Sequence, residues 1–290
     1  MLLMGFIAFS FPAWGAEVTF DVSSSIDWVS AELYSQTGFE LAQAGIRIPT
    51  GRFLGEEILE EAFPRLIRPY ILSIKIDSSS AVRDMLERGE ISLRALDSLS
   101  LGAEKTPPRL SPDLTRMNGN YTLSLEKVSA LINSNRRAFE PNRPLIPVQT
   151  ADYTGIIVIA NEELAVHGRA GHAFAEPCLF PKIWDTEMNL IYARNMFEAG
   201  AIGSFLMTRY AAPESIFRPT PSGLEGELEA LLGPRPLRIL ARGIFGISPT
   251  DPIIDREDAL KILSSENNRR LLREGRVLLV LDERNLQASF

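Results

Sequence analysis

The spacing of apolar residues predicts several helices in the first half of the chain. Between residues 52 and 76, apolar side chains recur on one broad face at helical spacing, which predicts a long amphipathic helix. Pro64 and Pro69 fall inside this segment and are expected to kink or divide the helix, because proline lacks an N–H donor and clashes with the preceding turn. Further helices are expected in three places: after the cap-forming stretch 77–80 and ending at Gly89, over 91–101, and over 126–132.

Alternating or continuous apolar runs predict strands in both halves. Alternation over 26–36 predicts one half-buried strand. Asn118-Gly119, flanked by short apolar–polar stretches, is typical of a two-residue turn and predicts a hairpin over 114–124. In the second half we expect a strand pair across the turn 185–188, and the remaining elements are strands over 154–160, 237–244 and 276–282 and helices over 224–232 and from 255 to 274.

The order of these elements indicates the α+β class, because helices alternate with hairpins and do not form a regular βαβ series. We expect an N-terminal strand–helix–strand–strand domain followed by a β-rich α+β C-terminal part. Several prolines between 135 and 150 indicate an extended linker. The predicted organisation is therefore a signal peptide over 1–16, an N-terminal domain over 17–134, a linker over 135–150 and a C-terminal domain over 151–290.

The first sixteen residues, Met1 to Ala16, carry no charge and end in small side chains. A short apolar run of this kind is typical of the apolar region and cleavage site of a secretory signal peptide. It is shorter than the roughly 20 apolar residues that span a bilayer. The usual Lys or Arg before the apolar run is missing, and a buried N-terminal strand or helix is the alternative interpretation. We expect export, and hence a periplasmic or secreted protein without a transmembrane segment in the mature chain.

Composition narrows the possible partners. The chain has a formal net charge of −7, so binding to nucleic acid is not expected, because affinity for phosphates depends on basic residues. Cys178 is the single cysteine, which excludes a disulfide within the chain. It is also far from the leader and cannot be the lipid-bearing first residue of a mature lipoprotein. A soluble envelope protein without a lipid anchor is the simplest interpretation.

Candidate metal ligands cluster in one glycine-rich segment that contains His167, His172, Glu176 and Cys178. A zinc site needs three or four converging nitrogen, sulfur or oxygen ligands. The spacing of these residues matches no standard zinc motif. We therefore interpret the histidines as solvent-facing loop residues and the cysteine as a small buried thiol, and we expect no metal or other cofactor.

Candidate catalytic groups are equally sparse. Asp185 and Glu187 stand at strand spacing, but they fall in a predicted turn, where aspartate is favoured for local hydrogen bonds. Arg136-Arg137 and Arg269-Arg270 are small basic clusters that we interpret as solvated faces. The sequence holds no nucleophile elbow, phosphate-binding glycine loop or zinc-protease motif. We assign no catalytic, cofactor-binding or metal residue and expect a protein that is not an enzyme.

A resemblance to a known group lies in the segment from about 54 to 132. Its motif is I-x-x-D-S-x-S-x-V-x-D, formed here by Ile74, Asp77, Ser78, Ser80, Val82 and Asp84. This segment resembles a domain of small bacterial outer-membrane lipoproteins and of flagellar assembly protein T, a component of the flagellar H ring. The second part, with 153–160, 177–196 and the tail from 237 to 282, resembles accessory segments of such chains. The whole arrangement is most similar to exported spirochaete proteins of unknown function.

The resemblance implies a non-enzymatic cell-envelope protein with a structural or assembly role and protein partners in the envelope. In its narrower form it implies an association with periplasmic flagella. The lipid-bearing cysteine of the lipoprotein members is missing, so membrane anchoring is not implied. The alternative is a periplasmic binding module for a small ligand or a cell-wall fragment. A deep apolar pocket with converging polar groups favours the binding module, and a flat apolar surface patch favours the assembly role.

Overall fold

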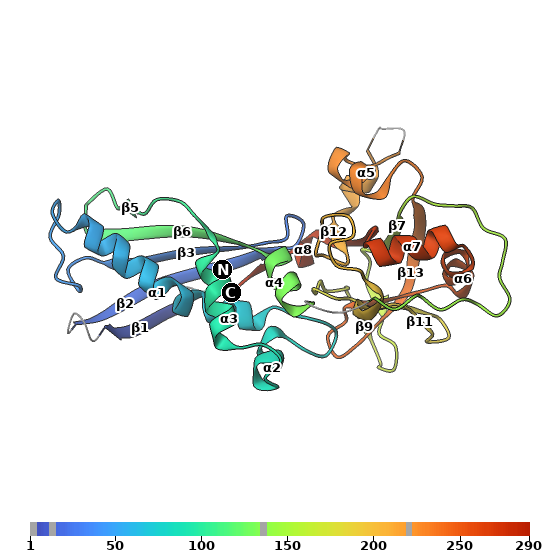
Figure 1. Ribbon diagram of the computed structural model, residues 1–290, viewed down its shortest axis with the longest axis horizontal. Coiled ribbons are helices and arrows are strands. Elements are labelled where there is room, and N and C mark those ends of the chain that lie inside the picture. The colour runs from blue at the N-terminus through green and yellow to red at the C-terminus, as the bar shows by residue number, and fades with distance from the viewer. Residues whose placement is uncertain (1–4, 12–15, 134–137, 219–221) are drawn as a thin grey trace.

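A computed structural model describes residues 5–11, 16–133, 138–218 and 222–290 of the chain. The fold is α+β, as predicted: strands and then a long helix form the N-terminal half, and a β-rich part follows. The two halves lie end to end along the long axis of the molecule (Figure 1). Within the described ranges, no helix is long and apolar enough to cross a membrane.

The N-terminal half is an antiparallel sheet with helices on one face. The long strands β2 (Ala16–Asp27), β3 (Glu32–Glu40) and β6 (Arg116–Ser124) form its centre. Shorter strands complete the sheet at its edges: β1 (Gly5–Phe11), β4 (Glu104–Lys105), β5 (Arg109–Leu110) and β16 (Gln287–Ser289). The helices of this half are α1 (Arg52–Ser73), α2 (Val82–Glu87), α3 (Leu93–Leu101) and α4 (Leu125–Ile132).

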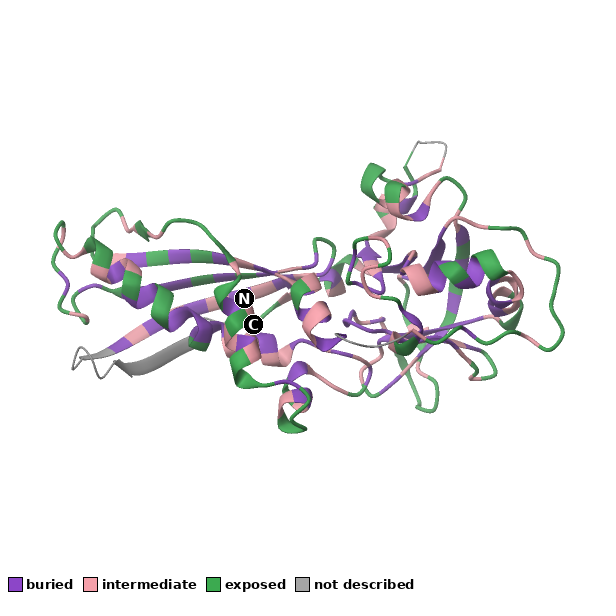
Figure 2. Cartoon of the chain, viewed as in Figure 1, coloured by how far each residue is buried: buried purple, intermediate pink, exposed green. Residues whose placement is uncertain are grey.

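Alternation along β3 and β6 directs one face of this sheet toward α1. Leu33, Phe39 and Leu123 are buried in cores that contain residues of α1, whereas Gln36 and Asn120 are exposed. Figure 2 shows buried and exposed positions alternating along the strands of this sheet. Antiparallel sheets tolerate one solvated face, because each strand carries apolar and polar residues in turn. The segment predicted as one strand over 26–36 is in fact a hairpin, since β2 ends and β3 begins around the turn 28–31.

Three other expectations for this half are wrong in whole or in part. Asn118-Gly119 is not a turn, because both residues lie inside β6 and pair with Gly38 and Thr37 of β3. Of the two effects expected of Pro64 and Pro69, a kink or a division of the helix, division does not occur, because α1 runs through both. The stretch 77–80 does not cap a helix, because α2 begins only at Val82.

The position of Gly119 has a packing reason. A Cβ atom there would lie 2.6 Å from a methyl carbon of Leu59 on α1 and 3.0 Å from the ring of Tyr121. Leu59 is fully buried, so it has little room to move. Glycine therefore allows α1 to approach the sheet closely. The glycine at this position is explained by packing and not by a turn.

The C-terminal half is a mixed sheet with a parallel centre. Its order is β11-β10-β14-β13-β7-β15-β12, and β7 (Ile156–Ala160) is parallel to both of its neighbours, β13 (Leu237–Phe245) and β15 (Val277–Leu281). The flanking strands are β10 (Ile183–Asp185), β11 (Leu190–Tyr192), β12 (Arg209–Ala211) and β14 (Asp251–Ile254). The hairpin of β10 and β11 is confirmed, but the parallel centre was not anticipated.

Helices and short elements surround this sheet. The helices are α5 (Gly226–Leu232), α6 (Arg256–Ser264), α7 (Glu266–Glu274) and α8 (Glu283–Leu286), with 3-10 turns at Arg194–Met196 and Pro213–Ile216. Strands β8 (Leu164–Ala165) and β9 (His172–Ala173) form a separate two-stranded ladder. Gly275 ends α7 in the left-handed conformation, as its position after the helical pattern predicts.

The two halves share structure across the predicted boundaries. Residues 138–150 have no regular secondary structure, and this segment runs along the outside of the C-terminal half, where Val148 N donates to Ser264 Oγ at 3.0 Å. The end of the chain returns to the N-terminal sheet, because β16 pairs with β2. β1 pairs with the other part of the same β2 edge, so cleavage after Ala16 would leave that part of β2 without this neighbour. The signal peptide itself stays a prediction.

We expect Gly119→Val to lower the free energy of unfolding by about 1–3 kcal/mol, the usual cost of overpacking a filled core. Asn120→Ala, one position further on the exposed face of β6, is the control and should change it by less than about 0.5 kcal/mol. Urea unfolding followed by circular dichroism measures both. Equal stability of the two variants would contradict the close approach of α1.

Candidate binding site at the junction of the two halves

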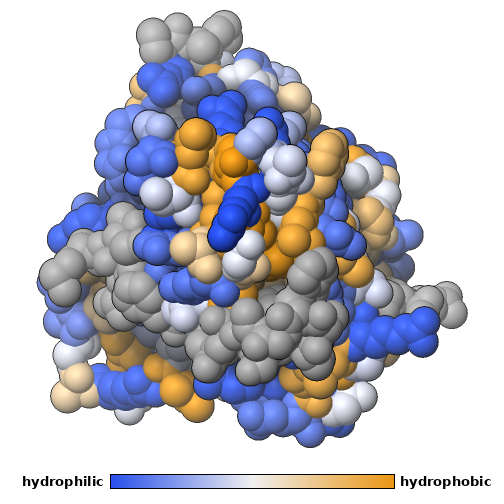
Figure 3. Space-filling model, turned by 90° about the vertical axis from the view of Figure 1, so that its left-hand side faces the viewer, coloured by the Kyte–Doolittle hydropathy of each residue, from blue (hydrophilic) through white to orange (hydrophobic). Residues whose placement is uncertain are grey.

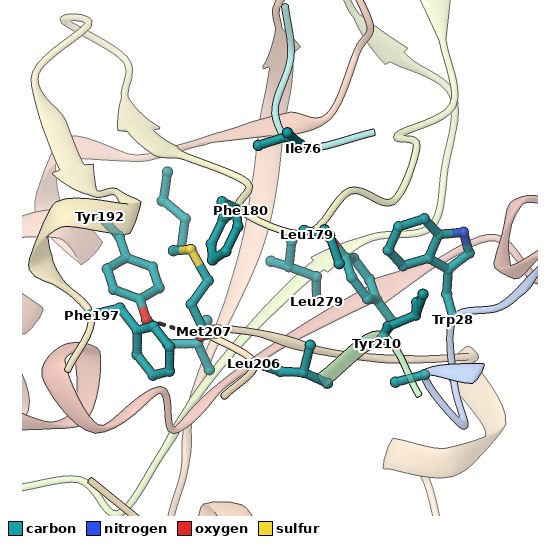
Figure 4. Close-up of a cluster of buried hydrophobic side chains, with 14 of the residues drawn as sticks. Trp28, Ile76, Leu179, Phe180, Tyr192, Phe197, Leu206, Met207, Tyr210 and Leu279 are labelled. Atoms are coloured by element: carbon teal, nitrogen blue, oxygen red, sulfur yellow. Dashed lines mark hydrogen bonds between the residues drawn. The ribbon is translucent and has the colours of Figure 1, made fainter. Parts of the chain in front are cut away.

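The turn between β2 and β3 inserts into the C-terminal half. The indole of Trp28 lies edge-on to the ring of Tyr210 of β12, with 5.7 Å between ring centroids (Figure 4). Trp28 N donates to Leu286 O at 2.9 Å, and Leu125 N donates to Ala31 O at 2.8 Å. Trp28 is 6% exposed, so its burial depends on both halves. The turn therefore fixes the N-terminal sheet to the C-terminal part.

A second contact is made by backbone pairing at the end of α1. Leu179 N donates to Lys75 O at 3.0 Å, and Phe180 N donates to Ile76 O at 2.8 Å. The side chains of Ile76, Leu179 and Phe180 belong to one hydrophobic core that spans both halves (Figure 4). Backbone bonds and a continuous core together make the junction a rigid connection.

The motif residues that follow Ile76 form a compact loop. Asp77 Oδ1 accepts hydrogen bonds from Ser79 N and Ser80 N, both at 2.9 Å. Burial alone would raise the pKa of Asp77, but the hydrogen bonds from Ser79 and Ser80 outweigh it and lower the pKa. Asp84 Oδ2 in turn accepts from Ala81 N at 2.6 Å at the start of α2. The aspartates of the motif therefore hold a turn and a helix start.

Ser78 is the residue of this loop that contacts the C-terminal half. It is buried, and its carbonyl oxygen accepts a hydrogen bond from Ser248 N at 2.9 Å. Gly246 lies against it with a φ of +121°, where a Cβ atom would lie 2.3 Å from Ser78 Cβ. Glycine is required at Gly246 for both reasons. The serine of the motif thus has a docking role.

Next to Ser78 lies a buried carboxylate, Asp251 of β14. Its Oδ1 accepts hydrogen bonds from Lys182 N at 3.1 Å and from Thr250 Oγ1 at 2.9 Å. Burial nevertheless raises the pKa of Asp251 above its usual value, because these two bonds do not replace full hydration. The carboxylate therefore costs stability when it is ionised.

Cys178 lies in the same buried region. Its backbone N donates to Tyr210 Oη at 3.0 Å, and Tyr210 Oη donates to Cys178 O at 2.7 Å. Burial raises the pKa of the thiol, and the neighbouring Asp251 raises it further, so the thiol stays protonated. A protonated, enclosed thiol is a poor nucleophile. The interpretation of Cys178 as a small buried residue is confirmed.

A cavity of about 210 Å³ opens beside Trp28 at the junction. Its wall comes from β2, the end of α1, the segment 176–177 and the last residues of the chain. Apolar side chains form the floor, and Lys75, Glu176 and Arg284 carry charges at its rim. This combination of an apolar floor and a few polar groups is what small-molecule sites require.

A wider groove of about 700 Å³ lies on the other side of the same turn. It is lined by Val29 and Ser30 of the turn, by β12 and by the start of α5. Three carboxylates line it, Asp27, Glu225 and Glu227, and Asp27 Oδ1 already accepts from Val29 N at 2.8 Å. The groove is larger and has a more polar wall than the smaller cavity.

The candidate metal ligands His167, His172, Glu176 and Cys178 do not come together. His167 and His172 are exposed near the β8–β9 ladder, whereas Cys178 is enclosed at the junction and Glu176 pairs with Lys75. Among the residues that the structure describes, no three histidine, cysteine, aspartate or glutamate side chains converge. Within this segment, Glu176 and Cys178 contribute contacts to the junction, whereas the two histidines face solvent.

Asp185 and Glu187 are also separated by their contacts. Asp185 is buried and accepts hydrogen bonds from Glu187 N at 2.9 Å and from Asn189 N and Nδ2, both at 2.8 Å. Glu187 points away to an ion pair with Arg256. Asp185 therefore caps the turn between β10 and β11, as the turn interpretation predicts.

Of the pair Arg269-Arg270, one arginine lies on a solvated face, as expected, and the other does not. Arg269 is buried, and its guanidinium donates to Leu263 O and pairs with Glu266. Arg270 is exposed, with Glu274 3.5 Å away. The expectation is therefore wrong for Arg269, which joins α6 to α7. Arg136-Arg137 lie outside the described residues.

Sequence reasoning missed the junction residues for a simple reason. The residues of the junction come from four distant segments, and no short motif contains two of them. They are Trp28, Ser78, Tyr210 and Asp251. The one available signal was the motif Ile74–Asp84, which the resemblance singled out without giving it a role.

Comparison with known families identifies the two halves of the fold. Residues 19–131 match the family model for the N-terminal domain of Treponema pallidum Tp0624, and residues 155–283 match the model for its second domain. Together the matches cover most of the chain. The protein therefore belongs to this spirochaete domain family. A search of curated proteins gave no match.

The spirochaete part of the resemblance is thus confirmed. The relation to outer-membrane lipoproteins and to flagellar assembly protein T is not among these matches and stays a prediction. The matched ranges fall on either side of the segment 135–150, where the linker is predicted.

The opposite pKa directions of Asp251 and Asp77 give a prediction about pH. The raised pKa of Asp251 means that its ionisation destabilises the fold above the ordinary value near 3.8, and this cost disappears below it. Asp251→Asn removes this cost. The difference in free energy of unfolding between the variant and the parent protein should therefore favour the variant more at pH 7 than at pH 3. The free energy of unfolding at both pH values, from urea titration, measures the difference.

Asp77→Asn is the matched control and should behave oppositely. The lowered pKa of Asp77 contributes stability that is present above about 3.8 and is lost as the pH falls through the folded value. This variant should lose more stability at pH 7 than at pH 3. The same sign for both variants would contradict the assignment of these two environments.

Proposed function

We propose that the protein is an exported, non-enzymatic structural or assembly factor of the cell envelope that acts through its surfaces. The observation that carries the proposal is the single core shared by two end-to-end halves. A rigid elongated body of this kind can hold partners at its two ends at a fixed separation. Export is supported by the uncharged run Met1–Ala16 with its small-residue end.

Exposed apolar side chains at both ends support an assembly role. At the N-terminal end, the sheet-end patch consists of exposed Phe53 and Leu114 with the partly buried Ile48 and Leu54. Figure 3 shows apolar residues gathered on this face of the molecule. Phe53 is 83% exposed, although an aromatic side chain gains much from burial. Apolar patches on a surface are typical of protein contacts.

The opposite end carries the linker tip, which consists of Leu145 and Ile146. Leu145 is fully exposed and Ile146 is 82% exposed, between Pro144 and Pro147. The segment is held before and after the tip by Arg143, 3.0 Å from Glu266, and by the bond from Val148 N. An anchored loop keeps its tip in one place, which lowers the entropy lost on binding.

The narrower version of the proposal places this role at periplasmic flagella. It rests on the resemblance of Ile74–Asp84 to the domain of flagellar assembly protein T. Deletion of the chain tests it directly, because loss of motility is expected from the flagellar role. Normal motility with damaged envelope integrity would leave the broader envelope role and remove the flagellar one.

The second candidate function is a binding module for a small ligand or a cell-wall fragment. The cavity of about 210 Å³ beside Trp28 favours it, because apolar and charged groups converge there from both halves. The two functions are compatible, since a bound ligand would contact the junction that holds the body rigid.

Export is tested by sequencing the N-terminus of the protein isolated from envelope and periplasmic fractions. We expect the mature chain to begin between Trp14 and Val18, because the small residues of the leader end there. A cytoplasmic protein that retains Met1 would contradict export. The same fractionation shows whether the protein remains in the envelope.

The assembly role is tested by substitutions at the two ends. Phe53→Ser and the double change Leu145→Ser with Ile146→Ser should each weaken binding to a partner cross-linked in the envelope by about 2 kcal/mol, the lower bound for a contact hot spot. Leu101→Ser is the control, because Leu101 is 70% exposed but belongs to neither end. Thermal unfolding should be unchanged in all three variants.

A substitution at a candidate catalytic carboxylate tests whether the protein is an enzyme, with the phenotype of the cells as the readout. Glu187→Gln keeps the shape of an exposed carboxylate and should leave the phenotype intact. A lost phenotype with normal folding and partner binding in this variant would overturn the non-enzymatic proposal.

A further inference from the structure

The cavity beside Trp28 has an apolar floor built from three distant segments. Ile26 and Trp28 come from β2 and its turn, Ile74 follows α1, and Phe290 comes from the last segment of the chain. Ile26, Trp28 and Ile74 are nearly completely buried, so their positions are fixed by the core. The floor is therefore an apolar surface whose shape is set by the packing of the core.

The rim of the cavity carries opposite charges in pairs. Lys75 Nζ and Glu176 Oε2 form an ion pair across the junction, with 39% and 37% of their side chains exposed. Arg284 donates from Nε to Asp282 Oδ1 at 2.8 Å and from Nη2 to Asp282 Oδ2 at 3.0 Å. The amide of Asn285 donates to Ala175 O at 3.0 Å. Each charge at the rim thus has a partner of opposite sign.

We infer that this cavity binds a small zwitterion with an apolar side chain, that is, a free hydrophobic amino acid. The apolar side chain would occupy the floor, the carboxylate of the ligand would face Lys75, and its ammonium would face Glu176. The inference rests on the second candidate function and specifies its ligand class. It does not depend on the assembly role.

The paired rim decides the charge of the ligand. A ligand that carries one charge separates Lys75 from Glu176 and satisfies only one of them, which leaves the other partly desolvated and unpaired. A ligand that carries both charges replaces both halves of the pair at once. The volume of about 210 Å³ is below the range for drug-sized ligands, so it suits a single residue.

Four probes separate the contributions of charge and side chain in isothermal titration calorimetry with the full chain. L-leucine carries both charges and the apolar group, 4-methylpentanoate lacks the ammonium, isoamylamine lacks the carboxylate, and glycine lacks the side chain. We expect L-leucine to bind at least tenfold more tightly than each of the other three, since one charged hydrogen bond or one apolar side chain accounts for a factor of this size.

Two variants test the site, and a third is the control. Glu176→Gln should remove the preference for L-leucine over 4-methylpentanoate, and Lys75→Met should remove the preference over isoamylamine. Lys105→Met is the control for Lys75→Met. Lys105 forms an ion pair with Glu60, this pair is partly exposed like the pair of Lys75 and Glu176, and it lies away from the cavity. Lys105→Met should leave all four affinities unchanged. Thermal unfolding of each variant checks that the junction remains folded.

The outcomes distinguish this inference from the function on which it rests. Tighter binding of 4-methylpentanoate or isoamylamine than of L-leucine would overturn the zwitterion and leave a small-ligand site. No binding of any probe at millimolar concentration would overturn the inferred ligand class. L-leucine binding that is unchanged in both Lys75→Met and Glu176→Gln would place the site elsewhere. The envelope role is decided separately by the fractionation and cross-linking results.

Discussion

The burial of Trp28 against Tyr210 is the contact on which the rest of the molecule depends. The indole belongs to a turn of the N-terminal sheet, and the tyrosine belongs to an edge strand of the C-terminal sheet. Burying a large aromatic side chain contributes a few kcal/mol, which is a large part of the net stability of a domain. The turn 28–31 therefore cannot leave its site without exposing the core that both halves share. This coupling makes two matched domains one body.

The junction also contains polar groups whose opposing effects on stability are visible in their pKa values. Asp77 gains enough hydrogen bonds from Ser79 and Ser80 to overcome its burial, whereas Asp251 does not gain enough from Lys182 and Thr250. An apolar residue in place of Asp251 would fill the same space without this cost, but it would leave Lys182 N and Thr250 Oγ1 without an acceptor. The carboxylate thus supports the backbone of the C-terminal half where the motif loop docks.

How much of this could be predicted follows from the range of each interaction. The helices over 91–101 and 126–132 and the strands over 154–160 and 276–282 are specified by local patterns, and the structure places them within a few residues.

Gly119 shows where local patterns fail. The dipeptide Asn118-Gly119 is a strong turn signal, but Leu59, sixty positions earlier, needs the space that glycine leaves. The uninterrupted helix α1 has the same kind of explanation, because its packing on the sheet outweighs the lost bonds of Pro64 and Pro69.

The candidate site is less predictable than the fold for a related reason. Lys75 and Glu176 are about a hundred residues apart, and the floor of the cavity is completed by Phe290 at the other end of the sequence. No spacing rule connects such residues, because they meet only after the two sheets have docked.

The docking of the two sheets also has a thermodynamic consequence for ligand binding. A ligand held by both halves binds only the docked arrangement, so its binding free energy adds to the stability of the junction. A small molecule at this site would then strengthen the connection between the sheet-end patch and the linker tip, and ligand binding and assembly would be linked through Trp28.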